Sequence, residues 1–208
     1  MVTLLGKAIS RSARCLWALE EVGVVYEHKP LNYSTGDAKT AEFRAINPGA
    51  KIPVLVDGDV TLFESLAINL YVAQAYGKGG LWPDDAAGQA LCLQWTLFSA
   101  TEVEPPGATR LVQFIFKAPE DREQDVIDAA GEKAKPSLYT LEATLQCRAY
   151  LAGDTFTVGD LNAACSIEYL TRTGFDLSPW PKTKDWITRC LDRRAYHAVA
   201  AIKAKEAA

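Results

Sequence analysis

Segments that favour β-strands are confined to the part of this sequence before residue 64. Short runs rich in β-branched and aromatic residues occur at 2–5, 24–31, 52–56 and 60–63. Helix patterns separate the first three runs, whereas only the tight-turn sequence Asp-Gly-Asp at 57–59 separates the last two. A helix between two strands predicts a parallel crossover, and a tight turn predicts an antiparallel hairpin. With a helix after the last strand, the pattern predicts a βαβαββα block with a mixed four-stranded sheet.

The rest of the sequence shows helical spacing only. A stretch rich in Gly, Pro and Asp follows the last helix of the block and is typical of a linker. We therefore expect a first domain over residues 1–77, a linker over 78–87 and an all-α domain over 88–208. The last long helix pattern of that domain runs over 183–205. An earlier one contains Pro136, where we expect a kink or a break because proline has no amide N–H.

Composition excludes several classes of partner. The net charge of −4 does not favour nucleic acid or an anionic membrane, and no apolar run approaches the roughly 18 residues that span a bilayer. The N-terminal segment lacks the apolar core of a secretory signal. The five cysteines are widely spaced, with no C-x-x-C and no histidines at metal-ligand spacing. We expect buried free thiols, a reducing cytoplasm and no metal.

Two short motifs are candidates for ligand binding. Pro53 begins a strand, where a cis X-Pro bond would present the backbone of Ile52 to a ligand; the alternative is an ordinary trans proline in an edge strand. Glu64 and Ser65 open the helix after the hairpin. A serine hydroxyl and free helix N–H groups suit a carboxylate, and a glutamate suits an ammonium group, so the pair fits an α-amino acid head. The alternative is a plain helix cap beside a solvated carboxylate.

Taken jointly, these features resemble the glutathione-binding, thioredoxin-like domain of the cytosolic glutathione transferases. The helical part is similar to the second domain of that family, so the resemblance covers nearly the whole chain and points to its serine-dependent theta, phi and delta types. The segment SRSARCLWALEEVGVVYE at 10–27 resembles the family's first helix and second strand. Thr157 and Asp160 form a capping box that resembles the start of a core helix in the second domain, and we interpret them as folding residues.

The resemblance implies a role for each motif residue. The backbone of Ile52 would pair with the cysteinyl part of glutathione beside a cis Pro53, and Glu64 and Ser65 would hold the γ-glutamyl head. Lys51 would reach the glycine carboxylate, unless it is merely solvated. It also implies that glutathione is the co-substrate, that a small electrophile is the second substrate, and that the protein is a homodimer.

The group that activates the thiol is a tyrosine, serine or cysteine in members of this family. No tyrosine precedes Tyr26, and Cys15 falls on the apolar stripe of the first expected helix, which favours a core thiol. Ser10 and Ser12 remain. Ser10 is our first choice because it precedes the helix, but its hydroxyl is also a natural helix cap. The segment lacks the proline that is common near the family's catalytic residue, which leaves the choice between the two serines open.

The implied chemistry needs no metal. Ser10 would donate to the glutathione sulfur and stabilise a thiolate, which attacks an electrophilic carbon. Arg11 and Arg14 would add positive potential or serve as structural ion-pair partners. Two other readings remain: a non-catalytic interaction module, as in the amino-terminal part of the translation elongation factor gamma subunit, and a glutathione-dependent peroxidase, dehalogenase or isomerase.

Overall fold

The computed structural model describes residues 1–31 and 36–207, so Ala208, the end of the expected helical domain, lies outside the described residues. Contacts divide the chain into two compact units. Met1–Leu81 and Asp192–Ala208 form one, which we call the sheet unit, and Trp82–Leu191 form the other, which we call the helical unit.

Within the described residues, the sheet has four strands: β1 (Val2–Leu5), β2 (Tyr26–Lys29), β3 (Val54–Asp57) and β4 (Val60–Phe63). Their order in the sheet is β2-β1-β3-β4. β1 and β2 are parallel, whereas β3 is antiparallel to both β1 and β4. β3 and β4 are joined by a two-residue turn, since Asp57 pairs with Val60. The mixed four-stranded sheet is therefore confirmed.

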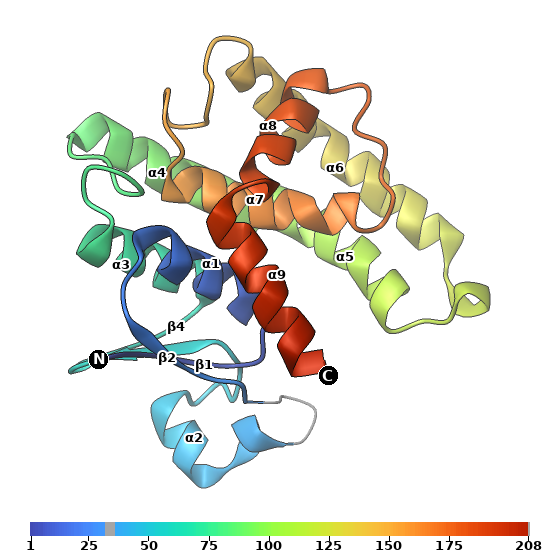
Figure 1. Ribbon diagram of the computed structural model, residues 1–208. Helices are drawn as coiled ribbons and strands as arrows, with labels where there is room; N and C mark the ends of the chain where they lie inside the picture. Colours follow the sequence, from blue (N-terminus) through green and yellow to red (C-terminus); the bar gives the residue numbers. More distant parts are fainter. Residues whose placement is uncertain (32–35, 208) are drawn as a thin grey trace. The chain divides into compact units, whose positions relative to one another are not determined.

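The helices of the first part also follow the predicted order. α1 (Ser12–Val22) connects β1 to β2, α2 (Ala41–Ile46) precedes β3, and α3 (Ser65–Tyr76) follows β4. Figure 1 shows α1 and α3 on one face of the sheet and α2 on the other. The βαβαββα block is thus confirmed. A short 3-10 turn, η1 (Asp37–Lys39), precedes α2 and is distinct from it. The two are distinct because the Thr40 side chain accepts a hydrogen bond from the Phe43 amide and so caps the start of α2.

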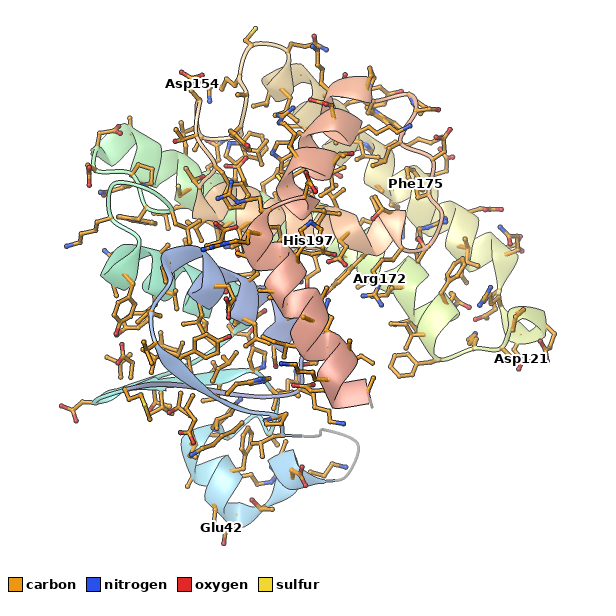
Figure 2. The ribbon with its side chains drawn as sticks, viewed as in Figure 1. Glu42, Asp121, Asp154, Arg172, Phe175 and His197 are labelled. Carbon is orange, nitrogen blue, oxygen red and sulfur yellow. The ribbon has the colours of Figure 1, made fainter. Side chains whose placement is uncertain are left out.

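Both faces of the sheet are covered by apolar side chains. On the α2 side, Leu5 and Val54 from the strands pack with Phe43, while Glu42 lies on the outer side of α2, away from the sheet (Figure 2). On the α1 side, Leu16 is completely buried, as the helical spacing predicts. Cys15 is buried on the same helix, which confirms its interpretation as a core thiol.

The five cysteines all lie in the described residues and form no disulfide, and most of them are buried. Cys147 is the exception to the expected burial, because it lies in the turn that follows α6 (Gln124–Leu145) and is exposed. The expectation that every thiol is buried was therefore wrong at this position.

α9 (Arg194–Ala207) belongs to the sheet unit, although the sequence placed residues up to 208 in the helical domain. The reason is its packing on α1. The Arg193 guanidinium donates to both carboxylate oxygens of Glu21, at 2.6 and 2.7 Å, and the rings of Trp17 and Tyr196 meet edge to face at 5.0 Å. No periodicity within the helix reveals such long-range contacts. The domain bounds at 77 and 88 remain predictions.

Apart from an isolated β-bridge between Tyr150 and Gly153, the regular elements described in the helical unit are helices, as predicted. Its elements are α4 (Ala86–Phe98), the π-helical turn η2 (Ser99–Val103), α5 (Glu104–Ile115), the 3-10 turn η3 (Pro119–Asp121), α6, α7 (Val158–Thr171) and α8 (Pro181–Leu191).

Three details of the helices differ from the expectation. The pattern over 183–205 is divided between α8 and α9, which a turn at Asp192 and Arg193 separates. α6 continues through Pro136, so of the kink or break that we expected there, the break does not occur. α5 was not anticipated, because Pro105 and Pro106 look like helix breakers, but they occupy its first turn, where proline needs no amide partner.

The predicted capping box of α7 is confirmed. The Thr157 amide donates to Asp160 Oδ2 at 3.0 Å, and the Thr157 side chain accepts from the amide three residues on. Asp160 also accepts from the Leu151 amide at 2.8 Å and from the indole N–H of Trp186 at 2.9 Å. Burial raises the pKa of this carboxyl, while its hydrogen bonds act in the opposite direction. Thr157 and Asp160 thus join several segments of the helical unit.

Among the described residues, no helix combines the length and the apolar character needed to cross a membrane.

Candidate functional site

The loop between β1 and α1 is shaped by Gly6. This residue has φ of 133°, a region that side chains rarely adopt. A Cβ here would lie 2.2 Å from Ser12 Oγ and 3.0 Å from Ile52 Cβ. Only glycine therefore lets the backbone pass this closely between α1 and the segment before β3.

Ser10 lies just before α1, and Ser12 is the first residue of that helix, as the sequence predicted. The Ser10 hydroxyl lies 2.7 Å from the Lys7 carbonyl oxygen, to which it donates, and 2.9 Å from Ser12 Oγ. It also accepts from the Ser12 amide at 3.1 Å. Ser10 is half-buried, whereas Ser12 is 0% exposed. Of the two serines, Ser10 is therefore the one that is partly accessible to solvent.

Asn47 holds the loop that leads into β3. Its side-chain N–H donates to the Lys51 carbonyl at 2.7 Å, and its Oδ1 accepts from the Gly49 amide at 3.0 Å. The Ile52–Pro53 peptide bond at the end of this loop is cis, as the resemblance implies. Sequence reasoning did not single out Asn47, although Asn-Pro-Gly is a turn signal in which the asparagine bonds its own backbone.

Glu64 and Ser65 lie at the start of α3. Glu64 occupies the N-cap position with φ of 70° and ψ of 106°, a conformation that a non-glycine residue rarely adopts and that is often found at functional sites. Its side chain is exposed. Ser65 is the first helical residue, where the backbone N–H groups of α3 point outward, and it is 4% exposed.

A buried arginine lies behind Ser65. Arg14, on the first turns of α1, is 3% exposed, and its Nη1 is 3.5 Å from Ser65 Oγ. The guanidinium and the N-terminus of α3 both create positive potential at the Ser65 hydroxyl. The sequence named Arg14 as a neighbour of the candidate serines, but the pattern gave no sign that it reaches Ser65, which is distant along the chain.

These segments enclose a surface hollow of about 250 Å³ in the sheet unit. Of the predicted ligand-binding residues, Lys51, Ile52, Pro53, Glu64 and Ser65 line it, and Ser10 does not, although its neighbour Arg11 does. The other lining residues among those described are Asn47, Pro48, Gly49 and Phe63.

The charges around the hollow suit a ligand that carries both signs. Lys51 and Arg11 are exposed cations at its rim, and Arg14 adds positive charge near Ser65. Glu64 supplies a carboxylate beside the N-terminus of α3. A molecule with two carboxylates and one ammonium group would therefore find an oppositely charged partner for each.

Two family models match the chain. The one described as "Glutathione S-transferase, N-terminal domain" matches residues 1–74, and the one described as "Glutathione S-transferase, C-terminal domain" matches residues 106–194. Among curated proteins, "Glutathione S-transferase 4" from Zea mays is 38% identical over 205 residues, which cover 96% of this chain and 92% of the relative.

Solved structures of similar fold carry related names. Glutathione transferase F7 from Populus trichocarpa has a TM-score of 0.89 at 30% identity, with 98% of this chain and 99% of that chain covered. Glutathione S-transferase I from mais, in complex with an atrazine glutathione conjugate, has a TM-score of 0.87 at 32% identity, with 97% of each chain covered. The likeness therefore extends over nearly the whole chain.

Proposed function

Because this chain belongs to the glutathione S-transferase family of enzymes, we propose that the hydroxyl of Ser10 stabilises the thiolate of bound glutathione and that the thiolate sulfur attacks an electrophilic, hydrophobic second substrate. The observation that carries the proposal is the gathering of Lys51, Ile52, Glu64 and Ser65 around one hollow. The loop that bears Ser10 leads into the helix whose Arg14 reaches Ser65.

The γ-glutamyl head of glutathione is placed at the start of α3. Its carboxylate accepts hydrogen bonds from the Ser65 hydroxyl and from the free amides of the helix, with Arg14 adding positive potential from behind. Its ammonium group pairs with the carboxylate of Glu64. Glu64 is the N-cap residue of α3 and has the unusual positive φ described above. The two charges of the head thus meet complementary groups on adjacent residues.

The rest of the tripeptide follows the loop before β3. The cysteinyl backbone pairs with the N–H and C=O of Ile52, beside the cis Pro53. Lys51 is exposed next to it and meets the glycine carboxylate as a point charge. In this register the sulfur is directed toward the loop that carries Ser10.

Ser10 rather than Ser12 is proposed as the activating residue because of accessibility. Ser12 is completely buried, and its hydroxyl lies where a side chain on Gly6 would be. The Ser10 hydroxyl donates to the neutral Lys7 carbonyl in the free protein. When glutathione binds, it exchanges this hydrogen bond for one to an anionic sulfur, and charge-assisted bonds are the stronger kind.

The energy required is within reach of this arrangement. A thiol with a pKa of about 8.5 must fall by roughly two units to be mostly ionised at neutral pH, which is about 2.7 kcal/mol. A hydrogen bond to a charged group contributes about 1.5 to 3 kcal/mol. The N-terminus of α1 adds about 0.3 to 1 kcal/mol. Neither a metal nor a general base is needed.

In the reaction, the thiol proton passes to solvent and the thiolate attacks an electrophilic carbon. With an activated aryl halide, a sulfur–carbon bond forms, the carbon–halogen bond breaks and halide leaves. The conjugate held by the mais structure is the kind of product that this reaction makes, which supports conjugation over peroxide reduction or isomerisation as the main activity. By the same family likeness, we propose a cytoplasmic homodimer that acts in detoxification.

The test compares wild type with Glu64→Gln and with Glu42→Gln, which changes an exposed carboxylate on the outer side of α2 (Figure 2). Retention on immobilised glutathione and conjugation of an activated aryl halide are measured together. We expect wild type and Glu42→Gln to bind and react equally, and Glu64→Gln to lose roughly tenfold or more in affinity because the ammonium group loses its partner. Equal behaviour of all three would contradict the proposed site.

The main alternative is an interaction module that has kept the scaffold without its ligand. In that case wild type would neither be retained by glutathione nor form a conjugate, and would instead bind a protein partner stoichiometrically.

A further inference from the structure

One peptide unit connects the candidate catalytic serine to the end of the chain. The carbonyl of Lys7 accepts from the Ser10 hydroxyl at 2.7 Å and from the Ser10 amide at 3.0 Å. The N–H of Ala8, on the other side of the same peptide bond, donates to Glu206 Oε2 at 2.8 Å. Because a peptide unit is planar, whatever fixes the direction of the Ala8 N–H also fixes the direction of the Lys7 carbonyl.

The two preceding amides of this loop donate hydrogen bonds to carbonyls at and just after the end of β2. Gly6 donates its N–H to the Lys29 carbonyl at 2.8 Å, and Lys7 donates to the Leu31 carbonyl at 3.0 Å. Ala8 is completely buried, so water does not readily replace the partner of its amide. The amides of Gly6, Lys7 and Ala8 thus each have an acceptor, and for Ala8, the last of the three before Ser10, that acceptor is the carboxylate of Glu206.

Glu206 is held in place from two directions. It lies in the last turn of α9, and Arg193, the residue before this helix, pairs with Glu21 of α1. Its side chain is 13% exposed, and Oε1 lies 3.6 Å from Nε2 of His28, which in turn lies 2.9 Å from the Gly6 carbonyl. A carboxylate at the C-terminal end of a helix is disfavoured by the helix dipole. The hydrogen bond from the Ala8 N–H offsets that cost.

We propose that Glu206 is a positioning residue for thiol activation, acting through the Lys7–Ala8 peptide on Ser10. The inference rests on the proposed function of Ser10. When the Ser10 hydroxyl turns from the Lys7 carbonyl to the sulfur, the Ser10 amide keeps its bond to that carbonyl, and Glu206 keeps the peptide plane from rotating. The charged acceptor on the Ala8 N–H also polarises the Lys7 carbonyl. The hydrogen bond from the Ser10 amide to that carbonyl is therefore strengthened.

The experiment uses the full chain with Glu206→Ala, Glu206→Gln and, as a matched control, Lys205→Ala, which changes the exposed neighbour in α9. The pKa of the bound glutathione thiol is obtained from its thiolate absorbance as a function of pH, with the dissociation constant from calorimetry. We expect Glu206→Ala to lower the ratio of thiolate to thiol roughly three- to tenfold, the size of one hydrogen bond, with the affinity for glutathione nearly unchanged. Glu206→Gln keeps an oxygen acceptor and should fall between wild type and Glu206→Ala.

The same change is then made in a Ser10→Ala background. If Glu206 acts through Ser10, its replacement there has no further effect on the thiol pKa, whereas a general structural role would lower activity in both backgrounds. If Glu206→Ala does not fold, the comparison of Glu206→Gln with wild type carries the test.

The outcomes separate this inference from the proposed function. A wild type that forms no thiolate would refute both. Thiolate formation in wild type that is lost in Ser10→Ala but equal in Lys205→Ala and the Glu206 variants would leave the function standing and overturn the role of Glu206.

Discussion

Replacing Gly6 by alanine tests the geometry of the loop that carries Ser10. The added Cβ meets Ser12 Oγ at 2.2 Å and Ile52 Cβ at 3.0 Å, and φ is 133°. Holding a non-glycine residue in such a conformation costs about 1 to 3 kcal/mol. Overpacking in a closed site adds about 1 to 3 kcal/mol. We therefore expect a loss of roughly 2 to 6 kcal/mol of unfolding free energy, which is a large part of the roughly 5 to 15 kcal/mol of a typical protein.

Gly58→Ala is the matched control. Gly58 has φ of 57° in the hairpin turn, but a Cβ there meets no described atom within 4 Å, so only the conformational cost of about 1 to 2 kcal/mol remains. Urea unfolding of both variants gives the two losses, and calorimetry gives glutathione affinity. Adding Ser12→Ala to Gly6→Ala should recover part of the stability by removing the closest contact. If Gly6→Ala costs no more than Gly58→Ala, the close approach of these segments is refuted.

Three further predictions concern other parts of the chain. Ser65→Ala should weaken glutathione binding roughly tenfold by removing one donor to a carboxylate, and unchanged calorimetric affinity would argue against that contact. Asp160→Ala should lower the unfolding free energy by roughly 3 kcal/mol or more because buried donors, among them the Trp186 indole, lose their acceptor; a loss below about 1 kcal/mol in urea titration would contradict this. Hydrogen bonds from Tyr76 and Tyr71 lower the pKa of Asp57, so its contribution is present above the ordinary aspartate value of 3.8 and lost as pH falls below it. Asp57→Asn should therefore reduce the acid-induced loss of stability, and an unchanged pH profile would count against it.

Local patterns in the sequence predicted most of the sheet unit. The turn at Asp57 and Gly58 fixed the hairpin, and the helix pattern between β1 and β2 fixed their parallel pairing. The position of Glu64 and Ser65 at the start of α3 was predicted because the two residues are adjacent in the sequence and directly follow the hairpin. Such features depend on neighbours in the chain, which is why sequence reasoning reached them.

The features that the sequence did not reveal depend on distant contacts. Arg14 reaches Ser65, and the carboxylate of Glu206 reaches the amide of Ala8 from the other end of the chain. α9 has an ordinary helical pattern, and only its packing against Trp17 and neighbouring residues of α1 assigns it to the sheet unit. Periodicity shows which side of a helix is apolar, but not which surface covers it.

The proposed role of Ser10 is to stabilise the thiolate of bound glutathione with its hydroxyl. Titration of glutathione into wild type and Ser10→Ala, followed by calorimetry and by near-ultraviolet thiolate absorbance in the same samples, tests it most directly. We expect binding of similar strength in both proteins, because the γ-glutamyl site at Glu64 and Ser65 is unchanged, with thiolate formed at neutral pH in wild type only. Equal thiolate formation in Ser10→Ala would contradict it.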